Sequence, residues 1–220
     1  MTVRDLGGAE LARGFFSDVV QPLLSRAMPG LGYAAARLGS GSDVLGLDDA
    51  MSRDHDWGCR LTLLVDEDAR DQVQRISRIL AETLPERFGE FPVRFPVTWD
   101  SSVSHQVEVA TVGDFAASRL GVDPTGGLSA LDWLTVTGQS VLEVTAGPVF
   151  ADRTRTLAAV RSLLAWYPPE VERYVLAAGC TVDHAVPAQG AGQPCKWSTE
   201  PGSWITARSA RVRWISWSGD

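Results

Sequence analysis

The chain has 220 residues, of which 45% are hydrophobic, and a formal net charge of −7. This composition predicts a globular protein of one large or two small domains. The acidic balance argues against a nucleic-acid binder, which would present a basic face. No stretch is long and apolar enough to cross a bilayer, and the N-terminus lacks the features of a signal peptide. We therefore expect a cytoplasmic protein with neither a membrane nor a nucleic acid as partner.

The first helix is predicted over residues 8–28, where apolar side chains recur at helical spacing until Met28-Pro29-Gly30 ends the pattern. The apolar positions are Leu11, Phe15, Val19 and Leu23. Residues 33–38 fit a short strand or a helix equally well. They lead into a glycine-rich turn.

A strand over 57–65, a helix over 67–84 and a strand over 104–111 follow. The segment between the last two, 88–100, holds two prolines among aromatic residues and reads as an irregular connection. This order predicts an α/β (α+β) fold, in which helices cover one face of a small mixed β-sheet.

From residue 121 the pattern is helical, with segments near 128–135, 138–144, 152–166 and 169–178. Leu157, Val160 and Leu164 form one apolar stripe. We therefore divide the chain into a first domain over 1–120, a partial helical subdomain over 121–179 and a tail over 180–220.

The tail has no helical periodicity, is rich in Gly, Pro and Ser, and holds half of the tryptophans. Our hypothesis is that it is a divergent or frameshifted replacement for further helices. A native disordered tail is the alternative.

The candidate phosphate-binding and metal-binding residues begin with the turn Gly39-Ser40-Gly41-Ser42, which is followed by Asp54 and Asp56. Glycines let backbone N–H groups approach a phosphate closely, and Ser40 or Ser42 can donate a hydroxyl hydrogen bond to it. In a strand, alternate residues share a face, so both aspartates would point the same way. Two nearby carboxylates are stabilised by a cation between them, and oxygen ligands suit Mg²⁺.

Glu108 is the candidate third carboxylate. It lies in a strand whose alternation puts Gln106, Glu108 and Ala110 on one face and Val107 and Val109 on the other. Two metal ions that bracket a phosphoryl displacement usually need one more bridging or general-base group.

Together these residues resemble the polymerase β-like nucleotidyltransferase superfamily, whose members transfer a nucleoside monophosphate from an NTP to a hydroxyl. The runs 41–46, 52–58 and 142–150 resemble more narrowly the bacterial domain of unknown function 4037, a branch of that superfamily. The resemblance covers roughly residues 10–178. It implies a nucleotidyltransferase fold and makes residues 1–120 the catalytic domain.

The resemblance also implies roles for single residues. Asp54, Asp56 and Glu108 would be catalytic metal ligands, and Gly41 and Ser42 would contact phosphate. His55 departs from the superfamily pattern, which usually has an apolar residue between the two aspartates.

The expected function is therefore Mg²⁺-dependent transfer of NMP, with AMP the expected nucleotide, from an NTP to a hydroxyl of a small molecule or protein. Two Mg²⁺ ions are expected. Arg53 is a candidate phosphate contact, although a surface ion pair explains it equally well. The alternative is a non-catalytic nucleotide-binding or scaffold protein. The acceptor, the preferred base and the oligomeric state stay open.

Other chemistries fit less well. The chain has no Gly-Lys-Ser/Thr of a P-loop, no third glycine of a dinucleotide-binding turn and no Gly-x-Ser-x-Gly. The three cysteines have neither metal-site nor redox spacing. A zinc site built from His55, His105 and His184 would have a spacing that fits no recognised motif.

Overall fold

The computed structural model describes residues 7–48, 57–97 and 100–175. Its centre is a five-stranded mixed sheet. In spatial order the strands are β5 (Arg94–Val97), β6 (Asp100–Thr111), β2 (Arg60–Val65), β1 (Ala34–Ala36) and β7 (Val149–Asp152). β2 and β6 run parallel, whereas every other neighbouring pair is antiparallel. The predicted α+β class with a small mixed sheet is confirmed.

The predicted N-terminal helix is present as three consecutive helical pieces. They are α1 (Gly8–Phe15), a π-helical turn η2 (Phe16–Val20) and α2 (Gln21–Ala27). The apolar side of this helix is buried against the sheet through Leu11, Phe15, Val20 and Leu24. Residues 33–38 contain strand β1, which resolves the alternative that sequence left open.

One face of the sheet packs on α1, α2 and α3 (Val73–Thr83), which follows a 3-10 segment η5 (Glu67–Gln72). Strand alternation selects the residues that face these helices: Leu61, Leu63 and Val65 of β2 are all buried there. The predicted strand over 57–65 and helix over 67–84 are therefore both present, each with a different start.

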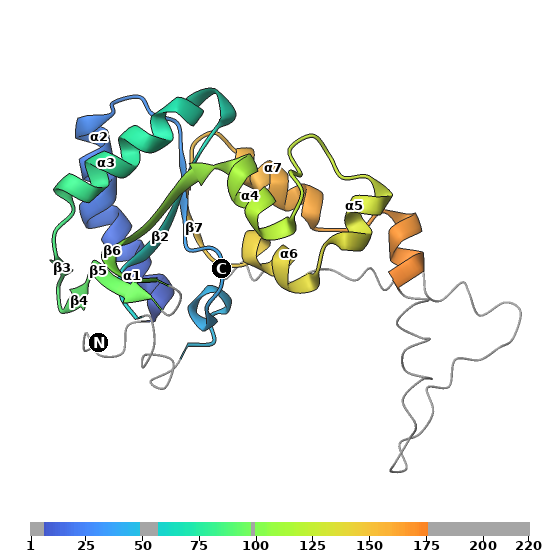
Figure 1. Cartoon of the computed structure of the whole chain (residues 1–220), viewed down its shortest axis with the longest axis horizontal. Coiled ribbons are helices and arrows are strands. Elements are labelled where there is room, and N and C mark those ends of the chain that lie inside the picture. The colour runs from blue at the N-terminus through green and yellow to red at the C-terminus, as the bar shows by residue number, and fades with distance from the viewer. Residues whose placement is uncertain (1–6, 49–56, 98–99, 176–220) are drawn as a thin grey trace, which may run out of the picture.

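The opposite face is covered by a second group of helices, so the expectation that helices cover one face is wrong (Figure 1). They are α4 (Val112–Leu120), α5 (Ala130–Thr135), α6 (Gly138–Thr145) and α7 (Thr156–Leu164). Residues 169–175 are also helical. The predicted stripe of Leu157, Val160 and Leu164 is buried in this second core. None of the helices within the described residues is long and apolar enough to span a membrane.

Two segments differ from their predicted form. Residues 88–100, expected to be irregular, contribute to β3 (Arg87–Phe88), β4 (Phe91–Pro92) and β5. Pro96 is tolerated because β5 is an edge strand. Strand β7 lies within the predicted helical subdomain, almost entirely between the segments predicted as helices near 138–144 and 152–166, and it pairs with β1. The sheet therefore joins the first domain to the segment that follows residue 121.

The chain around β7 contacts the end of β1 closely. The backbone N–H of Arg37 donates to the carbonyl of Pro148 at 3.0 Å, and that of Gly39 donates to Glu143 at 2.9 Å. Gly147 has a φ of 83°, and a Cβ there would lie 2.0 Å from the carbonyl oxygen of Arg37. The side chain of Arg161 holds this corner by donating to the carbonyls of Ala146 at 2.8 Å and Gly147 at 3.0 Å.

This close approach makes Gly147→Ala a sharp test of the packing. A side chain at positive φ costs about 1–3 kcal/mol, and overlap with a fixed backbone adds roughly 1–3 kcal/mol. Gly127→Ala is the matched control, because Gly127 also has a positive φ (91°) but nothing within 4 Å of its Cβ position. Urea unfolding should show a larger loss of stability for Gly147→Ala. Equal losses would contradict the contact with Arg37.

Candidate functional site

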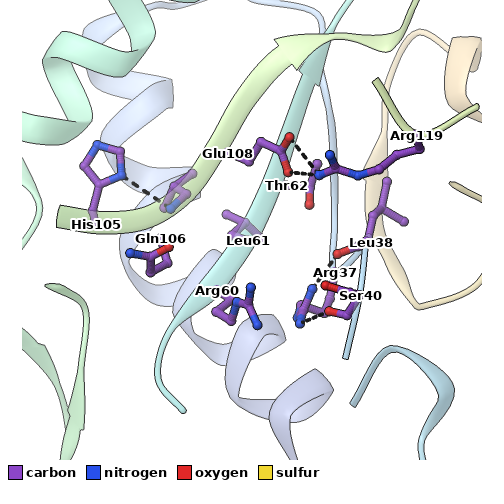
Figure 2. Close-up of a pocket in the computed structure, with 12 residues that line it drawn as sticks. Arg37, Leu38, Ser40, Arg60, Leu61, Thr62, His105, Gln106, Glu108 and Arg119 are labelled. Carbon is purple, nitrogen blue, oxygen red and sulfur yellow. Dashed lines mark hydrogen bonds and ion pairs between the residues drawn. The ribbon is translucent and has the colours of Figure 1, made fainter. Parts of the chain in front are cut away.

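A cavity of about 340 Å³ lies where β1, β2 and β6 meet. Because β1 is antiparallel to β2, the end of β1 and the chain that follows it lie beside the start of β2. Ala36 pairs with Thr62, and Thr62 pairs in turn with Glu108 of β6. The cavity is lined by Arg37 to Ser40, Arg60 to Thr62, His105 to Glu108, and Arg119 (Figure 2).

Glu108 reaches this cavity by strand alternation. Gln106 and Glu108 line it, and Ala110 packs against the core under α4 to α7. Val107 and Val109 pack on the opposite core, with α1 to α3. The predicted division of these residues between two faces is confirmed.

Arg119 binds the carboxylate of Glu108. Its Nη2 donates to both carboxylate oxygens, at 3.0 and 2.9 Å (Figure 2). Its Nε lies 3.6 Å from a carboxylate oxygen of Glu143. The guanidinium also lies over the ring of Phe115, 4.9 Å from its centroid. Because α4 starts directly after β6 at the N-cap Thr111, its last turn reaches Glu108 only by folding back along the strand.

Arg37 organises the glycine-serine turn. Its Nε and Nη2 donate to the two carboxylate oxygens of Asp43, at 2.7 and 2.9 Å. The same guanidinium donates to the carbonyls of Leu38 and Ser40. The side chains of Arg37 and Asp43 are only 4% and 13% exposed. An ion pair this well buried, with four of the five guanidinium N–H groups hydrogen-bonded, fixes the turn in one conformation.

Gly41 is required at the tightest point of that turn. Its φ is 136°, and a Cβ there would lie 2.3 Å from Oδ1 of Asp43 and 2.8 Å from Nη2 of Arg37. The Gly-Ser run is therefore a constrained loop rather than a flexible one.

The predicted site residues fall into three groups. Ser40 and Glu108 line the cavity. Gly41 and Ser42 follow in the same turn, exposed and outside the lining. Arg53, Asp54, His55 and Asp56 lie outside the described residues. Within 7–48, 57–97 and 100–175, no cluster of three or more His, Cys, Asp or Glu is arranged to hold a metal ion.

Sequence reasoning missed Arg37 and Arg119. The sequence could have pointed to Arg37, because a charged residue directly after three alanines of a strand must find a buried partner or leave the core. No sequence pattern points to Arg119, since its contact with Glu108 depends on how α4 folds back along β6. Together with Arg60 they bring three guanidinium groups to the cavity, and Glu108 is the carboxylate among the described residues that line it. Arg37 is paired with Asp43, and Arg119 with Glu108 and Glu143, so an anion would compete with these carboxylates for the two guanidinium groups.

His105 is among the lining residues, but strand alternation puts its imidazole on the face of β6 that carries Val107, away from Glu108. Burial lowers the pKa of His105, and the charge of Arg94 lowers it further. Nδ1 accepts the backbone N–H of Val107 at 3.3 Å, which requires that nitrogen to be unprotonated.

Comparison with known protein families gives a match over the C-terminal part of the chain. The family described as domain of unknown function (DUF4037) matches residues 133–211. This supports the resemblance to that family for the run 142–150, which lies inside the match, whereas the runs 41–46 and 52–58 precede it. The match also extends into the segment 180–220. Neither the curated proteins nor the solved structures contain a match.

The fold and the cavity therefore define an α+β protein whose arginine-containing site lies at the three central strands of a mixed sheet, β6, β2 and β1. Its residues 133–211 resemble the DUF4037 family. The matched run 142–150 is in contact with the site, because Glu143 and Pro148 accept hydrogen bonds from Gly39 and Arg37.

We predict that Arg37→Met destabilises the protein by about 3–5 kcal/mol, because it leaves the shielded carboxylate of Asp43 without its partner. In the double variant Arg37→Met/Asp43→Leu no charge is left unpaired, so much of that stability should return. Urea unfolding of the three proteins measures both effects. A double variant less stable than Arg37→Met would contradict the ion-pair account.

Stability should also depend on His105 through pH. Because the pKa of His105 is lower in the folded than in the unfolded chain, the unfolded chain binds more protons below pH ~6.5. Stability is therefore lost as pH falls through that value. Unfolding at pH 7.5 and pH 5.0 should show a smaller loss for His105→Gln than for the parent protein. An equal loss in both would show that His105 does not titrate in this way.

Proposed function

We propose that this chain is a Mg²⁺-dependent nucleotidyltransferase that moves a nucleoside monophosphate, with AMP the expected nucleotide, from an NTP to a hydroxyl of an acceptor. The observation that carries the proposal is the cavity itself. It brings Ser40 of the predicted phosphate turn, the predicted carboxylate Glu108 and three arginines to one cavity.

The triphosphate is proposed to lie along the turn that follows β1. The hydroxyl of Ser40 and the guanidinium groups of Arg60 and Arg119 are hydrogen-bond donors on the cavity wall, and charge-assisted bonds to phosphate are among the stronger ones in proteins. Arg37 acts indirectly, since its guanidinium is already bonded to Asp43 and to carbonyls of the turn.

Among the residues that the structure describes, the cavity lining offers part of a ligand set for an oxygen-preferring cation. Glu108 offers a carboxylate, and the Thr62 hydroxyl comes from the position paired with it on β2. Asp54 and Asp56 are proposed as the remaining ligands. Asp56 precedes Arg60 by four residues, which span at most ~14 Å, so the cavity is within reach. Bound Mg²⁺ would neutralise phosphate charge and favour attack at the α-phosphorus.

The reaction is an in-line displacement. The acceptor oxygen forms a bond to the α-phosphorus, the bond to pyrophosphate breaks, and the hydroxyl proton passes to Glu108 as general base. Arg60 and Arg119 would hold the triphosphate, and the charge of the leaving pyrophosphate would be stabilised by the same groups.

The non-catalytic alternative has one observation in its favour. Arg119 already engages both carboxylate oxygens of Glu108, and an ion pair competes with a metal ion for them. A protein of this second kind binds nucleotide without transferring any part of it.

Transfer of labelled AMP from α-³²P-ATP to a panel of sugars, nucleosides and hydroxyl-bearing peptides tests the proposal. We expect Glu108→Gln and Asp54→Ala each to lower the rate at least ~100-fold, because general-base and metal-ligand contributions are of that order. Glu82→Gln is the control, an exposed glutamate on α3. Full activity in either site variant would refute the assignment, and ATP binding without transfer to any acceptor would favour the alternative.

A further inference from the structure

Arg119 stands between two carboxylates that belong to different parts of the chain. Glu108 is on β6 and Glu143 is on α6, within the matched range 133–211. One guanidinium thus faces two carboxylates, 3.0 Å or less from the first and 3.6 Å from the second. The three groups together carry one net negative charge.

The contact with Glu108 is open to exchange. The side chains of Arg119 and Glu108 are 27% and 44% exposed, and both line the cavity. Pairs that water can reach are held by modest free energies, so a ligand with higher charge can displace one partner. By contrast, the pair of Arg37 with Asp43 is buried and fixed.

Glu143 keeps the arginine at the cavity when Glu108 leaves it. The Glu143 side chain accepts a hydrogen bond from Gln139 at 3.0 Å, and its backbone carbonyl binds the N–H of Gly39. Phe115 packs under the guanidinium. A guanidinium released by Glu108 therefore stays beside Gly39 and Ser40, where the proposed function puts the phosphates.

We propose that Arg119 is a positioning residue that exchanges partners. In the ligand-free protein it neutralises Glu108, and when a divalent cation binds Glu108 it turns to the phosphates of the nucleotide. The inference rests on the proposed function for the nature of the ligand. Cation and nucleotide binding then favour each other. The cation takes Glu108 away from Arg119, and the phosphates take Arg119 away from Glu108.

The exchange predicts opposite effects of one substitution. Arg119→Gln leaves Glu108 unpaired, so Mn²⁺ alone should bind about tenfold more tightly than to the parent protein. The same variant lacks a phosphate contact, so Mn²⁺·ATP should bind about tenfold more weakly. The affinities of Arg119→Lys for Mn²⁺ and for Mn²⁺·ATP should lie between those of Arg119→Gln and the parent protein. Calorimetry and electron paramagnetic resonance of Mn²⁺ measure the affinities for Mn²⁺ and for Mn²⁺·ATP.

Arg70→Gln is the matched control, because Arg70 also binds two carboxylates, Glu67 and Asp114, outside the cavity lining. It should leave both affinities unchanged. A general loss of structure would weaken binding of both ligands, so only opposite shifts in the Arg119 variant support the exchange.

Glu108→Gln gives a second, independent reading if Arg119→Gln does not fold. It frees Arg119, so ATP in the presence of a chelator should bind about tenfold more tightly than to the parent protein. If the parent protein binds Mn²⁺·ATP but these variants shift both affinities together or not at all, the exchange is overturned and the proposed function stands. If the parent protein binds no Mn²⁺·ATP, the exchange and the proposed function are both refuted.

Discussion

The buried ion pair between Arg37 and Asp43 is the constraint on which the site depends. A guanidinium this deep is stable only if its hydrogen bonds are made, and Asp43 and the carbonyls of Leu38 and Ser40 make them. In consequence the chain after β1 turns back on itself, and Gly41 takes a φ of 136°. Without that turn, Ser40 would have no fixed relation to the sheet.

The sheet and the second group of helices supply the other side of the site. Gly147 allows the backbone of 142–150 to approach Arg37, and the carbonyls of Glu143 and Pro148 take up the N–H groups of Gly39 and Arg37. Arg161 is buried among the carbonyls of this corner, and burial lowers its pKa to about 10, so it is still charged at neutral pH. The run 142–150, which lies within the DUF4037 match, therefore holds in place the segment Arg37 to Ser40 that lines the cavity.

Much of this arrangement was accessible from sequence because it follows from periodicity. The alternation of residues 106–110 predicted correctly which face Glu108 occupies, and the helical spacing of Leu157, Val160 and Leu164 predicted a buried stripe. Strand β7 was missed because four residues with no polar alternation have no strand signal of their own, and their pairing with β1 is set at long range.

The contacts of Arg119 depend on tertiary structure, which local sequence patterns do not predict. The partner of Arg119 lies eleven positions earlier in sequence, across a strand-to-helix turn, and no spacing rule predicts that contact. Similarly, the second layer of helices could not be assigned to a sheet face before the crossing of α4 over β6 was known. Side-chain periodicity predicts which face of an element is buried, but the direction in which the next element leaves it is a tertiary property.

The measurement that tests the central claim most directly is a crystal structure with Mn²⁺ and a non-hydrolysable ATP analogue, in which anomalous scattering locates the metal. The account predicts Mn²⁺ on Glu108 and the triphosphate beside Ser40 and Arg119. A nucleotide bound elsewhere, or an occupied cavity in which Glu108 has no metal contact, would contradict it.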